Sequence, residues 1–68
     1  MSTWQKVFTA PQSYRSEMVR AILEEHGLSP IMVNKQDSNY HFGEHEVYVL
    51  PHDVLRALKI IRDDIQFE

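Results

Sequence analysis

The fold is decided by residues 13–33, SYRSEMVRAILEEHGLSPIMV, which hold a helix, its end and the start of a strand. Apolar residues recur there about every 3.6 positions, so the spacing predicts a helix over residues 13–26. Gly27 suits the position just past a helix, where the backbone turns left-handed, and Leu28 can then fold back on the last turn. Pro30 cannot extend the helix but is tolerated as the first residue of a strand. The predicted apolar side of this helix comprises Tyr14, Met18, Val19, Ala21, Ile22 and Leu23.

Three strand patterns and a second helix pattern surround this stretch. The strands are rich in β-branched and aromatic residues, and the second helix follows Pro51, because proline is favoured where a helix begins. In chain order the predicted elements are strand 4–9, helix 13–26, strand 30–35, polar loop 36–45, strand 46–50 and helix 52–65. The apolar stripe of the second helix comprises Val54, Ala57, Leu58, Ile61 and Ile65.

This order of elements predicts one α+β domain over residues 1–68 with a ferredoxin-like βαββα fold. The second and third strands read as an antiparallel hairpin with a long loop. A strand–helix–strand connection within one sheet is right-handed, and we expect both helices to cover the same side of the sheet. The prediction is therefore a three-stranded sheet with two helices packed on one face.

Length and composition restrict the possible functions. The chain has 68 residues, 43% of them hydrophobic, no cysteine and a formal net charge of −3 at pH 7. This length suits one small domain and excludes most large enzyme folds. The acidic charge argues against nucleic acid and anionic lipid as partners. Residues 1–12 lack a signal-peptide pattern, and no segment approaches the roughly 18 apolar residues that span a bilayer, so we expect a cytoplasmic protein without a membrane partner.

Both faces of the predicted sheet are apolar, which is unusual for a monomer. Alternate residues of a strand point to opposite faces. One face collects Val7, Ile31, Val33, Val47 and Val49, and the other collects Trp4, Phe8, Met32, Tyr48 and Leu50. If the helices cover the first face, they leave the second exposed; because both sets are apolar, the reverse assignment is also open. That exposure favours a homodimer, either through the second face or through the unpaired edge of the first strand. The residues predicted to contact the second copy are Trp4, Phe8, Met32 and Tyr48.

Two pairs of side chains in the loop 36–45 are candidates for binding. His41 and His45 are four residues apart and have carboxylates nearby, so a histidine-based metal site can be drawn. That spacing brings two ligands together only on a helix, whereas Asn39 and Gly43 favour a turn; we therefore expect a solvated loop without a metal. The aromatic side chains of Tyr40 and Phe42 either anchor this loop or contact a partner.

No constellation of catalytic residues is recognisable in the sequence. It contains no glycine-rich phosphate loop, no GxSxG motif and no cysteine nucleophile. A small three-stranded sheet also offers little concavity for an active site. We therefore expect neither enzymatic activity nor a cofactor.

The helix, turn and strand residues of this chain form a characteristic set. The set comprises EMVRAILE (residues 17–24), Gly27-Leu28, Pro30, Val47-Tyr48-Val49, Pro51, Asp53 and Ala57. With these residues the chain resembles, over residues 7–65, the small prokaryotic family of unknown function labelled "putative signal transducing protein". The resemblance implies a ferredoxin-like fold similar to that of the nitrogen-regulatory signalling proteins, a bacterial origin and a cytoplasmic location. It brings no catalytic residue with it.

The function expected from the sequence is that of a small, non-enzymatic regulatory or interaction domain. We expect it to form a homodimer and to transduce a signal through contact with a protein partner. Two alternatives remain open: a histidine-based metal-binding module, and a small-molecule sensor that binds its ligand at a dimer interface. Native mass spectrometry distinguishes them, because one spectrum reports the dimer mass, a retained metal and a co-purified ligand.

Overall fold

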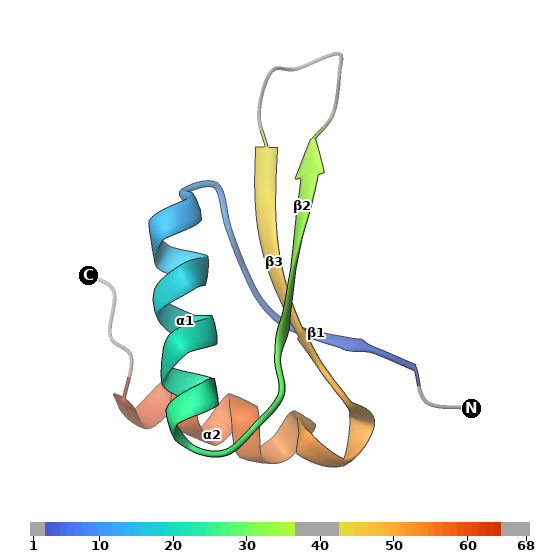
Figure 1. Ribbon diagram of the computed structural model, residues 1–68, viewed down its shortest axis with the longest axis vertical. Coiled ribbons are helices and arrows are strands. Elements are labelled where there is room, and N and C mark those ends of the chain that lie inside the picture. Colours follow the sequence, from blue (N-terminus) through green and yellow to red (C-terminus); the bar gives the residue numbers. More distant parts are fainter. Residues whose placement is uncertain (1–2, 37–42, 65–68) are drawn as a thin grey trace.

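The computed structural model describes residues 3–36 and 43–64. Its elements in chain order are β1 (Gln5–Ala10), α1 (Ser13–Glu25), β2 (Ile31–Gln36), β3 (Gly43–Val49), the short 3-10 helix η1 (Pro51–Asp53) and α2 (Val54–Asp64). This order confirms the predicted α+β, ferredoxin-like βαββα fold. Figure 1 shows α1 standing beside the sheet and α2 running across its lower end. Neither helix in the described part of the chain is long and apolar enough to cross a membrane.

β3 is the central strand of a three-stranded antiparallel sheet in the order β1-β3-β2. Phe8 of β1 and Met32 of β2 both lie opposite Val47 of β3. The register between β1 and β3 shifts between Lys6 and Phe8, an irregularity that bends a strand and increases its twist. The two strands predicted to form a hairpin, β2 and β3, do pair with each other.

Both helices bury their apolar sides against the same face of this sheet. The buried core consists of Val19 and Leu23 of α1, Leu28 of the following turn, Val47 and Val49 of β3, and Ala57 and Ile60 of α2. Since residues of both helices and of the central strand form one cluster, the predicted packing of two helices on one face is confirmed.

The end of α1 has the structure that the sequence predicts. Gly27 adopts a positive φ of 86°, in the left-handed region that favours glycine. The backbone N–H of Gly27 donates to the oxygen of Glu24, and that of Leu28 donates to the oxygen of Leu23. This pair of bonds is a Schellman motif, which satisfies carbonyl groups that the helix end would leave unpaired.

The buried side of α1 differs from the predicted one in part. Val19 and Leu23 are buried and Ile22 packs against the core, as predicted. Tyr14, Met18 and Ala21 are exposed instead, and Ser16 is buried. Ser16 is tolerated inside because its Oγ donates a hydrogen bond to the backbone oxygen of His45 at 2.6 Å. A hydropathy pattern cannot reveal such a position, because it assigns every serine to the solvent side.

α2 buries most of the predicted stripe. Ala57 is buried, and Val54 and Ile61 pack against the core, as the sequence predicts. Ile60, which the predicted stripe omits, is buried as well. Leu58, which the sequence assigns to the core, is exposed. Ile65 lies outside the described residues.

β3 begins earlier than the sequence predicts. The predicted loop covers residues 36–45, but Gly43 starts the strand, and His45 lies opposite Ala10 of β1 and Asn34 of β2. The hydrogen bonds of a sheet join backbone groups, so polar side chains do not prevent a residue from joining a central strand.

The register of β2 corrects the predicted division of the sheet faces. Residues paired across neighbouring strands lie on the same face. Met32 lies opposite the buried Val47, whereas Ile31 lies opposite Tyr48. Met32 therefore faces the helices, while Ile31 and Val33 face away from them. The grouping of Ile31 and Val33 with the valines of β3 is wrong.

The same correction applies to β1. Both Val7 and Phe8 pack against the core, at the point where the register shifts. The irregularity interrupts the strict alternation of side chains, so counting along the sequence assigns Phe8 to the wrong face. A shift of one residue turns every side chain to the opposite face, and hydropathy cannot fix the register when both sets are apolar.

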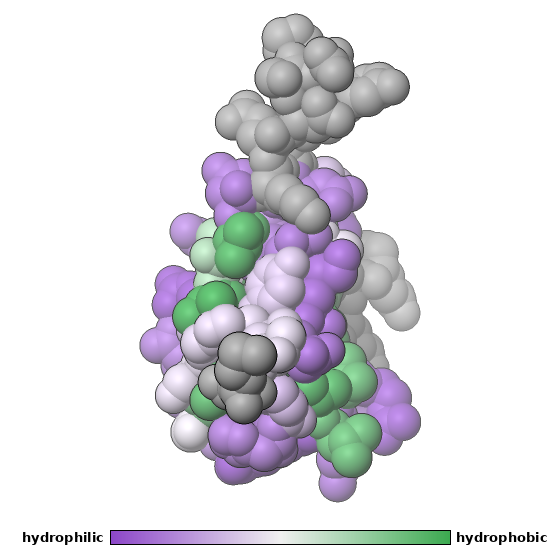
Figure 2. Space-filling view, turned by 90° about the vertical axis from the view of Figure 1, so that its right-hand side faces the viewer, coloured by the Kyte–Doolittle hydropathy of each residue, from purple (hydrophilic) through white to green (hydrophobic). Residues whose placement is uncertain are grey.

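The face turned away from the helices is mixed in character. Glu46 and Lys6 lie on it together with Ile31 and Val33. On the side of the molecule drawn in Figure 2, apolar surface likewise occurs as separate patches between hydrophilic and neutral residues. Of the aromatic residues expected on this face, Tyr48 lies there and Phe8 does not, and aliphatic side chains surround a charged centre.

Candidate interaction surface

The candidate site is the sheet face turned away from the helices, here termed the open face. Val47 and Val49 of β3 are buried in the core, so Glu46 and Tyr48 point to the opposite side. The register adds the neighbours of these two residues on both outer strands. The open face includes Lys6 and Thr9 of β1, Glu44, Glu46 and Tyr48 of β3, and Ile31 and Val33 of β2.

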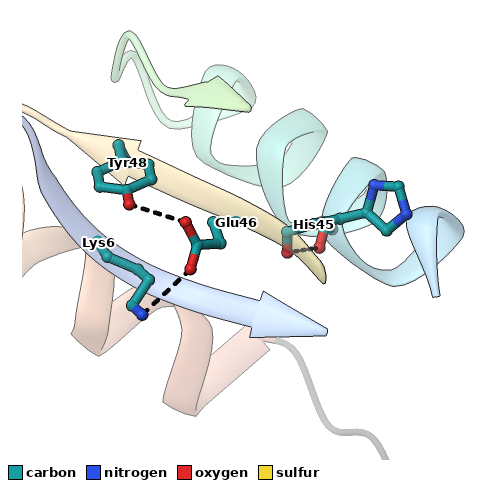
Figure 3. Close-up of polar contacts among 5 residues, drawn as sticks. Lys6, His45, Glu46 and Tyr48 are labelled. Atoms are coloured by element: carbon teal, nitrogen blue, oxygen red, sulfur yellow. Dashed lines mark hydrogen bonds and ion pairs between the residues drawn. The ribbon is translucent and has the colours of Figure 1, made fainter. Parts of the chain in front are cut away.

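Glu46 is the buried centre of the open face, with only 2% of its surface exposed. Lys6 donates from Nζ to Oε2 of Glu46 at 3.2 Å, and Tyr48 donates from Oη to Oε1 at 2.8 Å. Figure 3 shows both side chains converging on the carboxylate across β1 and β3. A buried carboxylate without partners is strongly destabilising, so these two donors explain why the sheet tolerates a glutamate here.

The carboxylate of Glu46 alters the acid–base behaviour of both donors. Its hydrogen bond with Lys6, and then its negative charge, raise the pKa of Lys6 above the ordinary value of 10.5. The hydrogen bond from Tyr48 to Glu46, and then desolvation, raise the pKa of Tyr48 above 10.0. Lys6 is therefore a cation and Tyr48 a neutral donor at neutral pH, and the charge of Glu46 is balanced within the sheet.

His45 lies on the other side of the sheet, toward the start of α1 (Figure 3). Its ring Nδ1 is buried and has no hydrogen-bond partner among the described residues. Its suggested companion in a metal site, His41, lies outside the described residues, as do Tyr40 and Phe42. Within residues 3–36 and 43–64, no group of three or more His, Cys, Asp or Glu side chains is placed to hold a metal ion. The alternative function of a histidine-based metal-binding module therefore receives no support from the described part of the chain.

The residues predicted to contact a second copy are divided between the two faces. Phe8 and Met32 pack against the core, which removes them from the set. Tyr48 lies on the open face, and Trp4, directly before β1, is exposed. The structure thus retains two of the four positions as accessible candidates.

The sequence analysis missed the cluster of Lys6, Glu46 and Tyr48. Part of the signal is present in the sequence, because Glu46 and Tyr48 are two residues apart on one strand and so share a face. A glutamate within a buried strand also requires a partner. The choice of Lys6 as that partner needs the register between β1 and β3, which the sequence alone does not provide.

The open face is bordered by two outer strands. Among the described residues, β1 and β2 each pair with β3 and with no other strand. Outer strands present backbone groups that can pair with a strand of another chain. The face and its two edges together form a surface suited to association.

Comparison with known proteins adds one finding. A family model described as "Putative prokaryotic signal transducing protein" matches residues 4–64, a span that includes every helix and strand of the fold. No curated protein and no solved structure matches the chain. The description of the family assigns a role in signalling and names neither a partner nor a functional residue.

Proposed function

The chain belongs to the prokaryotic family described as "Putative prokaryotic signal transducing protein", and from this membership we propose that it is a small, non-enzymatic signalling domain of the cytoplasm that acts through protein–protein contact. Its first partner in this proposal is a second copy of the chain, bound through the open face. The observation that carries the proposal is the open face itself, a sheet surface without a helix over it among the described residues, with exposed aliphatic side chains around a neutralised carboxylate.

The aliphatic residues of the open face favour its burial. Ile31 and Val33 are each 37% exposed although both are β-branched and apolar. Covering such surface contributes about 25 cal/mol for each Å² removed from water. Tyr48 lies between β1 and β2 on the same face and adds aromatic area, which is enriched in protein interfaces.

The charge of Glu46 does not oppose this burial. A solvated carboxylate at the centre of an interface would lose its water on association, at a cost of several kcal/mol. Glu46 has already lost most of that contact in the single chain, and Lys6 balances its charge. The Lys6 side chain is 48% exposed. Exposed charges at an interface determine the orientation of the two partners more than their affinity.

Contacts within the fold already engage two side chains that could carry out chemistry, those of Glu46 and Ser16. The carboxylate of Glu46 accepts from Lys6 and Tyr48, and the hydroxyl of Ser16 is buried and donates to the backbone oxygen of His45. These contacts leave neither side chain poised as a base or a nucleophile, which supports a contact role over a catalytic one.

The oligomeric state of the wild-type chain and of two variants tests the proposal. Val33→Lys places a positive charge on the open face, whereas Ser29→Lys places the same charge at an exposed position outside it. Sedimentation velocity into the high micromolar range should show a monomer–dimer equilibrium for the wild type and Ser29→Lys. Val33→Lys should lower the affinity of the dimer by at least about tenfold, because a lysine there must be desolvated. A wild-type chain that stays monomeric, or a Val33→Lys chain that dimerises equally well, contradicts the proposal.

A further inference from the structure

A second candidate surface lies on the outer side of α2. A shallow hollow of about 300 Å³ is lined there by Leu55, Leu58, Lys59 and Arg62, which we term the basic strip. Their spacing of three and four residues places all four on one side of the helix. Leu55 is 83% exposed and Leu58 is 45% exposed, so the strip combines uncovered apolar surface with two cations.

The cations of the basic strip are accessible to a partner. Lys59 has no ion pair within the described residues, and Nε of Arg62 lies 3.5 Å from Oδ1 of Asp63 in a largely exposed pair. Exposed pairs of this kind are weak and exchange readily. The chain as a whole carries a net charge of −3, so this strip is a local concentration of positive charge. A complementary partner surface is therefore both apolar and acidic.

The outer side of α1 has that character. Exposed residues recur there at helical spacing, and we term them the acidic strip: Tyr14, Glu17, Met18, Ala21 and Glu25. Of the two arginines of α1, Arg20 pairs with Glu24, whereas Cζ of Arg15 lies 6.0 Å from the ring centroid of Tyr14, so one cation borders the strip at its first residue. Within the described residues, no ion pair is formed by Glu17 or Glu25, so both carboxylates are available.

We propose that the acidic strip of one copy docks on the basic strip of another copy, in a contact separate from the open face. At 1.5 Å per residue the acidic strip is about 16 Å long and the basic strip about 10 Å, so the basic strip fits within the length of the acidic one. Tyr14 and Met18 supply apolar surface for the two leucines. The flanking charges, two carboxylates on one helix and two cations on the other, then oppose each other.

The arrangement of the strips allows two kinds of assembly. The acidic strip lies on α1 and the basic strip on α2, two helices that run in different directions in Figure 1. Each copy therefore offers one strip of each kind. Two copies that dock both pairs of strips at once form a two-fold dimer, and copies that dock one pair at a time form rings or open chains. Because the pairs are exposed, assembly should weaken as the Debye length falls from about 30 Å at 0.01 M salt to about 3 Å at 1 M.

The test uses charge reversal in the Val33→Lys background, so that the open face does not contribute. One chain carries Lys59→Glu and Arg62→Glu, and a second carries Glu17→Lys and Glu25→Lys. Light scattering at low salt should show each chain alone assembling about tenfold more weakly than the Val33→Lys parent. An equal mixture should recover assembly, because every strip then meets a strip of opposite charge. Gln12→Glu with Ser29→Glu adds charge outside both strips and should leave assembly unchanged.

Three results overturn the proposal. The first is a parent chain that shows no salt-dependent assembly, and the second is a mixture that fails to recover it. The third is binding of the parent to vesicles of phosphatidylserine and phosphatidylcholine without self-assembly, which assigns the basic strip to an anionic membrane surface. A dimer of the wild-type chain that is lost on Val33→Lys and is indifferent to salt supports the open face alone.

Discussion

Replacing Glu46 removes the one carboxylate that is almost fully buried among the described residues. Glu46→Ala deletes the acceptor of two hydrogen bonds and leaves a small cavity, so we expect it to lower the free energy of unfolding by about 2 kcal/mol. Glu46→Gln should cost less, because its amide oxygen still accepts from Tyr48. Urea unfolding followed by circular dichroism measures both changes.

Glu44→Ala is the matched control for this experiment. Glu44 lies on the same strand and is exposed, so its replacement should change the free energy of unfolding by less than about 0.5 kcal/mol. Equal losses for Glu44→Ala and Glu46→Ala would show that the contacts with Lys6 and Tyr48 contribute nothing to stability.

The end of α1 rests on the backbone conformation of a single glycine. Gly27 has a φ of 86°, and a Cβ added to it meets no atom within 4 Å. The cost of Gly27→Ala is therefore conformational strain alone, about 1–2 kcal/mol, and Gly27→Asn should cost less because asparagine tolerates this region. Thermal unfolding measures both variants, with Ser29→Ala as the nearby control. A Gly27→Ala chain as stable as the parent would place the helix end in another conformation.

The sequence predicts the helices better than it predicts the faces of the strands. The end of α1 depends on residues that are neighbours in the sequence, so Gly27 and Leu28 predict it without knowledge of the tertiary structure. The face that Ile31 and Met32 adopt depends instead on pairing with residues of β3 about 16 positions away. Both strand faces are apolar, so no local signal distinguishes the correct register from one shifted by a single residue.

The candidate site was predictable only in part for the same reason. Tyr48 stands out in the sequence as an aromatic residue within a strand, and its place on the open face follows once β3 is recognised. Glu46 reads there as an ordinary polar residue next to a loop. Its role appears only when the register brings Lys6 opposite Tyr48 and within 3.2 Å of the carboxylate.

For the molecule as a whole, the structure changes the physical basis for self-association. The sequence argument relies on exposed aromatic residues, but Phe8 and Met32 complete the core of a chain only 68 residues long. A domain of this size buries only about 60% of its unfolded surface, so its core draws apolar residues from both predicted sets. Among the described residues, the exposed apolar surface that remains comes from Trp4 before β1, from Ile31 and Val33 on the sheet, and from the outer sides of the helices.

The stability of the whole molecule should fall at alkaline pH. The native state raises the pKa of Lys6 above 10.5 and that of Tyr48 above 10.0, so it holds both protons more tightly than the unfolded chain does. A raised pKa contributes stability that is complete below the unfolded value and is lost as the pH rises through the folded value. The contributions of both groups are therefore present at neutral pH and decline from about pH 10 upward.

Urea midpoints measured from about pH 8 to about pH 12 test this expectation for the parent and three variants. Tyr48→Phe removes one titrating group and Lys6→Met the other, so each should flatten the alkaline decline. Tyr14→Phe, on the outer side of α1, should keep the parent profile. Because Glu46 is the main cause of both raised pKa values, Glu46→Gln should also flatten the decline, but less than both replacements together, since burial and the remaining amide oxygen still act on Tyr48. A decline unchanged by Glu46→Gln would contradict the coupling of Lys6 and Tyr48 to Glu46.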